Sequence, residues 1–309
     1  MSDDNLPVWL QPGPAEKYYQ RHLEQKPLRD AWVDMIRARW GTPKNPGLSL
    51  FPEILREDKI VPKTIDVDVP ITQFTPKHPS RDILIYIHGG GWVIPASGKH
   101  LAFAKRLAHM SNMAVMSVDY RLSPEHPFPA ALYDCITVYM HARQETTGRV
   151  FVSGDSAGGN MAAALALYCV DNGIQPPDKI LCLSTFSDHY FERYPSMLAL
   201  GIGSPYVEMS VIAFIRAFYV PNVKDWANPY ASPIYGELSM MPPTCVLVGM
   251  DDPLRDDNLA FAGKLKDANN SVNILTYEKM PHSFFTYPDV LPHPSEKACQ
   301  DIIKFIISE

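Results

Sequence analysis

The feature that most constrains the fold is a strand that runs into a helix with no room for a loop. The β-branched and aromatic residues 150–152 are followed, at about Ala157, by an alanine-rich helical pattern. Only a very tight turn connects the two, and Ser156 stands at its apex between Gly154 and Gly158. Such a turn strains its central residue and needs neighbours without a Cβ where strand and helix nearly touch. We therefore expect the Ser156 hydroxyl to stand above a sheet as a nucleophile, and the alternative is an ordinary glycine-rich turn.

The rest of the chain alternates between strand and helix patterns. Residues 64–74 alternate apolar and polar side chains, which predicts a half-buried strand at a sheet edge. Strands that alternate with helices indicate a mostly parallel sheet with right-handed crossovers. We predict an α/β fold of about eight strands with helices on both faces. Further buried strands are predicted at residues 83–87, 114–118, 180–183, 245–250 and 272–277, and helices at 99–110, 130–143, 258–268 and 295–307.

Two segments fall outside this alternation. Residues 1–50 carry two amphipathic helical patterns before any strand, and residues 187–221 contain an apolar helical run. We predict one domain over residues 1–309, with a helical cap formed by these two segments; simple packing is the alternative for each. Their aromatic residues suit a confined apolar pocket, although each is also explained by packing: Trp9, Trp32, Trp40, Tyr206, Phe214 and Phe218.

Three consecutive glycines, Gly89 to Gly91, follow His88 at the end of the predicted strand 83–87. A flexible turn would explain them, but glycines also let backbone N–H groups approach a developing negative charge. Removing one such donor typically costs about 3 kcal/mol of transition-state stabilisation. Because this loop lies one strand–helix–strand unit before the serine turn, we predict an oxyanion hole made by the N–H groups of Gly90, Gly91 and Ala157.

A histidine on a loop after a late strand is expected to be the general base. His282 follows the strand at residues 272–277 and precedes the last helix, so it is our choice. His293, which stands between two prolines, is the alternative. Four other histidines lie in helical patterns or at their edges and are interpreted as surface or packing residues: His22, His100, His109 and His141.

The acid that orients the base is expected after the preceding strand. Residues 251–257 offer four carboxylates there, most of which a surface loop or a helix N-terminus explains. We choose Asp252, which is followed by Pro253, and Asp251 is the main rival. The order Ser156, Asp252, His282 is the chain order that this arrangement needs. Asp155, beside the nucleophile, is expected to support the turn.

Four motifs carry a resemblance to a known family: His88-Gly-Gly-Gly-Trp, Asp119-Tyr-Arg-Leu-Ser-Pro-Glu, Gly154-Asp-Ser-Ala-Gly-Gly-Asn and Asp252-Pro-Leu-Arg-Asp. With them the chain resembles the hormone-sensitive-lipase-like group of α/β-hydrolase esterases from about residue 83 to its end, and the first fifty residues match only as a helical cap. The resemblance implies an α/β-hydrolase fold, nucleophile Ser156, acid Asp252 and base His282, without metal or cofactor. It also implies carboxylesterase activity on short- to medium-chain acyl esters, from acetyl to about octanoyl. Ser283 departs from the family, which often has glycine after the base.

Composition excludes several other classes of function. A net charge of −6 without a basic run argues against nucleic acid, and disfavours a strongly anionic substrate unless a local basic pocket overrides it. No apolar run is long enough to span a membrane, and the N-terminus lacks the apolar core of a secretory signal. The five scattered cysteines are expected to be reduced, so we predict a cytoplasmic protein. A homodimer is also expected, because relatives in the family often form dimers.

Three other functions remain open at this point. One is a non-catalytic small-molecule receptor on a hydrolase scaffold, although such proteins typically lose the base and a histidine stands here at its position. Another is an amidase or deacetylase that uses the same three residues. The third, an interfacial lipase, is disfavoured because the sequence shows no exposed apolar stretch.

Overall fold

The computed structural model describes residues 26–40, 46–205 and 207–308, and it has one central sheet of eight strands within them. This confirms the predicted α/β class. The strands are β1 (Leu55–Val61), β2 (Val69–Thr75), β3 (Ile83–Ile87), β4 (Ala114–Val118), β5 (Val150–Asp155), β6 (Lys179–Leu183), β7 (Thr244–Gly249) and β8 (Val272–Tyr277).

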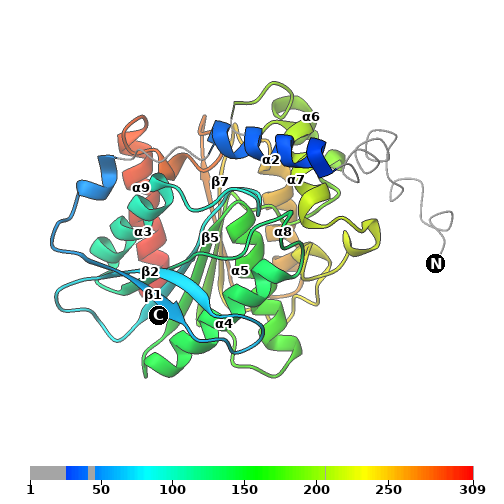
Figure 1. Cartoon of the computed structure of the whole chain (residues 1–309). Coiled ribbons are helices and arrows are strands. Elements are labelled where there is room, and N and C mark those ends of the chain that lie inside the picture. Colours follow the sequence, from blue (N-terminus) through cyan, green and yellow to red (C-terminus); the bar gives the residue numbers. More distant parts are fainter. Residues whose placement is uncertain (1–25, 41–45, 206, 309) are drawn as a thin grey trace.

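The strand order is β1-β2-β4-β3-β5-β6-β7-β8 (Figure 1). The pairs β1–β2 and β2–β4 are antiparallel, and every other neighbouring pair is parallel. β3 pairs directly with β5, and Ile87 stands opposite Gly154. The loops that leave these two strands are therefore neighbours at the carboxyl edge of the sheet, where α/β proteins place their sites.

The predicted edge strand at residues 64–74 is wrong in position and extent. β2 begins only at Val69 and pairs on both sides, so the edge of the sheet is β1. Six of the seven β1 residues are exposed and residues 56–59 are all charged, so no apolar alternation marks this strand in the sequence. Its place comes from main-chain pairing with β2, and its charges protect the edge from pairing with another chain.

Helices cover both faces of the sheet (Figure 1). The α-helices are α2 (Lys26–Trp40), α3 (Gly98–Ser111), α4 (Ala130–Glu145), α5 (Ala157–Asp171), α6 (Pro195–Leu200), α7 (Met209–Tyr219), α8 (Arg255–Asp267) and α9 (Pro292–Ile307). Short 3-10 helices lie at Pro46–Ser49, Phe191–Arg193, Val223–Asp225, Pro233–Tyr235 and Phe284–Thr286.

Two hydrophobic cores result, one on each face. On β3, Leu84 and Tyr86 point into a core shared with α3 and α9. Ile85 and Ile87 point into the other core, which also receives α4, α5 and α8. Because β3 is buried on both faces, its sequence is continuously apolar rather than alternating.

Helices α2, α6 and α7 lie above the carboxyl edge of the sheet (Figure 1). They come from the two segments predicted as a cap, of which residues 1–25 and 41–45 lie outside the described residues. Arg37 of α2 donates to the Val93 carbonyl over 3.0 Å and to the Glu125 carboxylate over 2.9 Å. These bonds attach α2 to the loops that follow β3 and β4.

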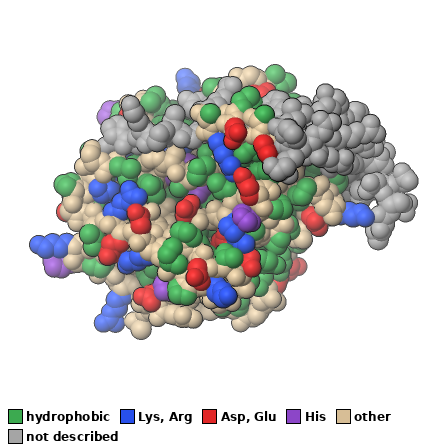
Figure 2. Space-filling view, in the orientation of Figure 1, with side chains coloured by type: hydrophobic (Ala, Val, Ile, Leu, Met, Phe, Trp, Pro, Cys, Tyr) green, Lys and Arg blue, Asp and Glu red, His purple; other side chains and the backbone are tan. Residues whose placement is uncertain are grey.

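The surface carries charge of both signs. On the face shown in Figure 2, basic and acidic side chains are interspersed rather than separated into large areas. None of the helices within the described ranges is long and apolar enough to cross a membrane.

Candidate active site

Ser156 occupies a strained turn between β5 and α5. Its φ of 54° and ψ of −119° are uncommon for a residue with a Cβ. A Cβ on Gly154 would lie 2.2 Å from the Gly158 backbone, and one on Gly158 would lie 1.9 Å from the Ile87 carbonyl oxygen. Only glycine therefore allows strand and helix to come so close. The Ser156 N–H donates to the Leu183 carbonyl over 2.9 Å, which helps to hold the strained residue in place.

The predicted base and acid are joined by hydrogen bonds. Nδ1 of His282 lies 2.9 Å from Asp252 Oδ2 and 3.1 Å from Oδ1. Asp252 is fully buried, and its Oδ1 also accepts the Leu254 N–H over 2.9 Å. A carboxylate on Nδ1 keeps the proton there and leaves Nε2 of a neutral imidazole as the proton acceptor. The rival Asp251 is exposed.

Ser156 and His282 line the same cavity. No hydrogen bond joins their side chains in the described part of the chain. Bonds of this kind commonly shorten only in the substrate complex, so the separation is compatible with proton transfer. His293, the alternative base, lies in the first turn of α9 and is not among the residues that line the cavity.

The glycine loop after β3 forms another part of the cavity wall. Gly90 and Gly91 have φ values of 119° and 60°, and Val93 and Ile94 donate to the Gly90 carbonyl over 3.2 and 3.0 Å. The N–H groups of Gly90, Gly91 and Ala157 have no hydrogen-bond acceptor among the residues that the structure describes. Since all three residues line the cavity, their N–H groups are available to a ligand oxygen.

Asp155 connects this loop to the serine turn. Its Oδ1 accepts the Gly89 N–H over 2.9 Å and the Tyr86 hydroxyl over 2.6 Å. Its Oδ2 accepts the Ser283 hydroxyl over 3.3 Å. The side chain is buried, as expected for a residue that supports the turn.

His88 is buried behind the glycine loop. Its ring stacks on Tyr120 with centroids 4.3 Å apart, and its Nδ1 lies 2.7 Å from the Gly89 carbonyl oxygen. Burial lowers the pKa of His88 below its ordinary value, so the ring is neutral near pH 7. A neutral Nδ1–H donates to the carbonyl, and His88 therefore helps to orient the first glycine of the loop.

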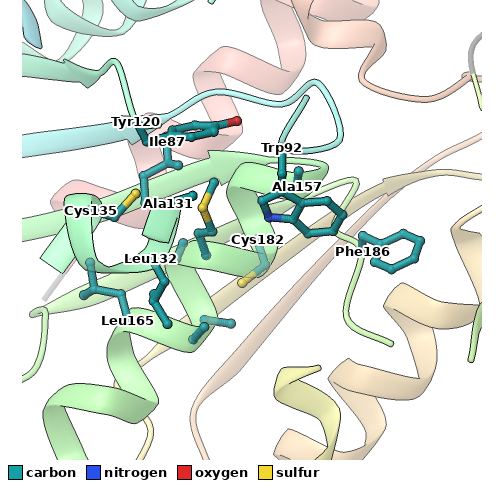
Figure 3. Close-up of a cluster of buried hydrophobic side chains, with 14 of the residues drawn as sticks. Ile87, Trp92, Tyr120, Ala131, Leu132, Cys135, Ala157, Leu165, Cys182 and Phe186 are labelled. Carbon is teal, nitrogen blue, oxygen red and sulfur yellow. The ribbon is translucent and has the colours of Figure 1, made fainter. Parts of the chain in front are cut away.

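Trp92 and the helix α7 close the cavity over the serine. The Trp92 ring stacks on Tyr219 of α7 with centroids 4.2 Å apart and packs edge-on against Phe186. Figure 3 shows Trp92 beside Ala157, with Phe186 beyond it. The cavity holds about 250 Å³, and the wall that α7 supplies is apolar: Val211, Ile212 and Ile215.

The aromatic residues predicted for a pocket do not line this cavity where the structure describes them. Phe214 and Phe218 point into the core instead. Trp9, Tyr206 and the side chains of Trp32 and Trp40 lie outside the described part. Aliphatic residues of α7 line the pocket instead: Val211, Ile212 and Ile215.

The sequence did not predict three polar residues of the cavity wall that lie outside the expected catalytic group. His100, interpreted as a surface or packing residue, is 3% exposed and lines it, as do Lys99 and Tyr287. A signal was present, because Lys99 and His100 begin the first helix after the glycine loop and so lie at the carboxyl edge of the sheet. That signal does not tell which face of the helix meets the cavity.

Comparisons with known proteins agree with this geometry. A family model for the α/β-hydrolase fold matches residues 84–286. The carboxylesterase NlhH of Mycobacterium tuberculosis is 29% identical over 85% of this chain and 86% of its own length. The esterase LipI of the same species is 32% identical over 74% and 73%. A crystal structure of an esterase from the bacterial hormone-sensitive lipase family superposes with a TM-score of 0.77, at 28% identity, over 90% of this chain and 96% of that one.

Family match, relatives and fold lead to the same enzyme class. The matched region contains the glycine loop, the serine turn, Asp252 and His282. The relatives are carboxylesterases and esterases whose lengths this chain largely covers. The protein is therefore a carboxylic ester hydrolase and belongs to the hormone-sensitive-lipase-like family of α/β-hydrolases.

Proposed function

We propose that the protein hydrolyses short- to medium-chain acyl esters, from acetyl to about octanoyl, through an acyl-enzyme on Ser156. The observation that carries this proposal is one small cavity lined by both Ser156 and His282, with Asp252 bonded to His282 from behind. Three backbone N–H groups that have no acceptor among the described residues line the same cavity.

In the first step, His282 Nε2 takes the Ser156 proton while the hydroxyl oxygen attacks the ester carbonyl. Asp252 holds the Nδ1–H tautomer and stabilises the imidazolium that forms. The N–H groups of Gly90, Gly91 and Ala157 bind the oxyanion. His282 then gives its proton to the leaving alcohol, and the acyl group stays on Ser156.

In the second step, water takes the place of the alcohol. His282 removes a proton from the water, the hydroxide attacks the acyl carbonyl, and the same N–H groups bind the second oxyanion. Collapse releases the carboxylic acid and returns the proton to Ser156. The cycle uses side chains and backbone of this chain throughout.

The size and character of the cavity support small esters. Its volume of about 250 Å³ lies below the usual range for drug-sized ligands, about 300–1,000 Å³. The aliphatic side chains of α7 favour an apolar acyl group by burial of apolar surface, and the volume limits its length. A long lipid chain would need a larger apolar groove.

The receptor alternative is weakened by the buried bond between Asp252 and His282, which a binding protein does not need. An amidase or deacetylase remains the second candidate, because the same residues attack amides. We keep the cytoplasmic location and the homodimer as predictions. The location is supported by five cysteines that are all buried and free.

The test is hydrolysis of an ester series from acetyl to dodecanoyl by the wild type and by Ser156→Ala. We expect maximal kcat/KM at short to medium chains and loss of turnover in the variant. Equal turnover by both proteins would disprove the role of Ser156, and a maximum at dodecanoyl would disprove the short-chain preference. Parallel acetanilide assays distinguish an amidase. An organophosphate probe should label Ser156 alone, as peptide mass analysis would show.

A further inference from the structure

One wall of the cavity is polar and basic, opposite in character to the α7 wall. It is formed by Lys99 and His100 at the start of α3 and by Tyr287 after β8. A hydrolase for simple alkyl esters needs no such wall, because the oxyanion hole and the base already serve every polar atom of the ester group.

Lys99 has a neutral partner rather than an acid. Its Nζ donates to the Tyr287 hydroxyl over 2.7 Å and lies 4.4 Å from the centroid of the same ring. Among the residues that the structure describes, no carboxylate forms an ion pair with Lys99. An ammonium carries three donors, so two remain for a ligand in the cavity.

His100, a buried residue, adds a second donor beside Lys99. Its Nδ1 accepts the Ser97 N–H over 3.1 Å, so the ring proton of the neutral form lies on Nε2. Burial holds the pKa of His100 well below its ordinary value, so the ring stays neutral near pH 7. Within the described residues Nε2 has no protein partner, and the residue lines the cavity. This N–H is therefore available to a ligand acceptor in the cavity.

Among the described residues that line the cavity, Glu208 is the only carboxylate besides Asp155, and it is bound elsewhere. Glu208 accepts the Val211 N–H over 3.1 Å and the Ser210 hydroxyl, which caps α7. The helix N-terminus offsets part of its charge. Within the described part of the cavity wall, Lys99 therefore remains the cation that a ligand meets.

We propose that the cavity selects esters that carry a carboxylate at the end away from the scissile bond, held by the Lys99 ammonium and the His100 Nε2–H. This inference rests on the proposed ester hydrolysis and names its substrate class. The net charge of −6 slows the approach of anions, but salt screens that field beyond about 10 Å, whereas Lys99 acts at contact. The charge belongs either to the acyl part, as in a dicarboxylic monoester, or to the alcohol part, as in an ester of a hydroxy acid.

The experiment compares two anionic esters with neutral isosteres in which an isopropyl group replaces the carboxylate. Methyl hydrogen glutarate carries the charge on the acyl part, and the acetate ester of γ-hydroxybutanoate carries it on the alcohol part. For each pair the ratio of kcat/KM, anionic over neutral, is measured by pH-stat titration. Wild type and Lys99→Met are assayed alongside Lys99→Arg, which keeps the charge.

We expect Lys99→Met to lower the ratio roughly ten- to hundred-fold for one of the two pairs, mainly through KM, as for a lost hydrogen bond to a charged group. Lys99→Arg should restore part of the preference, and added salt should raise KM for the anionic ester in the wild type. The affected pair identifies the part of the ester that carries the charge.

Lys77→Met is the matched control. Lys77 is exposed and follows β2. The end of β2 pairs with the start of β4, so Lys77 lies at the edge of the sheet opposite the cavity. The ratios of kcat/KM, anionic over neutral, in Lys77→Met should equal those of the wild type. Equal ratios in wild type and Lys99→Met for both pairs would overturn the proposal. Absence of hydrolysis of the neutral esters by the wild type would instead contradict the proposed function itself.

Discussion

The Ser283 hydroxyl donates a hydrogen bond to Asp155 Oδ2 over 3.3 Å and so joins two residues that are 128 positions apart. Ser283 follows the proposed base, and Asp155 precedes the proposed nucleophile. Asp155 also accepts the N–H of Gly89. One buried carboxylate therefore links the base loop, the serine turn and the glycine loop.

Replacing Ser283 separates two effects, the hydrogen bond and the backbone. Its φ of 49° lies in the left-handed region, which costs an L-residue roughly 1–2 kcal/mol. Ser283→Ala loses the hydroxyl and keeps the backbone strain. Ser283→Gly also loses the hydroxyl but relieves the backbone strain. We expect the glycine variant to be about 0.5–1 kcal/mol more stable than the alanine variant, since greater chain entropy offsets part of the relief.

Free energies of unfolding in urea test this order. The free energy of unfolding of the wild type should exceed that of Ser283→Ala by about 1–3 kcal/mol, because Asp155 Oδ2 loses its donor in a buried site. Equal stability of the alanine variant and the wild type would show that the hydrogen bond contributes nothing. Equal stability of the alanine and glycine variants would refute the argument from φ.

Adjacent carboxylates allow a matched test of the acid. Asp252→Asn should lower kcat by about 10³–10⁴-fold, because the amide favours the wrong imidazole tautomer. Asp251 is exposed, so Asp251→Asn should change kcat by no more than about twofold. Steady-state kinetics on one short ester decide between the two carboxylates. Circular dichroism checks that each variant is folded. A larger loss in Asp251→Asn would reverse the assignment.

Gly91 is expected to tolerate no side chain. A Cβ there would lie 2.7 Å from the Ile215 side chain, at a φ of 60°. Gly91→Ala should displace the loop and lower kcat by about 10²–10³-fold, as for a lost oxyanion donor. Gly263→Ala, in open space on α8, is the control and should keep full activity. Normal kcat in Gly91→Ala would show that the loop accommodates a side chain at this position without displacement.

Buried histidines make stability depend on pH. Burial lowers the pKa of His189 to about 3 and also lowers those of His88 and His100. The unfolded chain therefore binds more protons below about pH 6.5, so this stability is present above that pH and is lost as pH falls. Each ring should reduce the free energy of unfolding by up to about 1.4 kcal/mol per pH unit.

Urea unfolding between about pH 7 and pH 5 measures that slope. His189→Phe removes one titrating ring and keeps an aromatic side chain. The slope of the free energy of unfolding against pH should therefore decrease by the contribution of one ring. His78 is exposed, and His78→Gln should leave the slope unchanged. An identical slope in His189→Phe and the wild type would contradict the burial argument.

Much of the fold could be read from the sequence, because local patterns report burial. Residues 83–87, 114–118 and 272–277 form strands with the predicted bounds. The serine turn was readable because only glycine at Gly154 and Gly158 permits its geometry. Strand β1 was not readable, since its charged residues are held by main-chain pairing, which any sequence can make.

The sequence by itself determined the α/β fold, the serine turn and the order of Ser156, Asp252 and His282, because each depends on short spacings and strand patterns. Only the tertiary structure decided which side chains meet the cavity. The sequence favoured Asp252 with Asp251 as a rival, and the hydrogen bond from His282 to Asp252 comes from the structure. The positions of Lys99 and His100 on the cavity wall depend on the rotation of α3 about its axis. The physical reason is that chain order brings loops to one edge of the sheet, whereas packing of whole elements sets which face each helix turns inward.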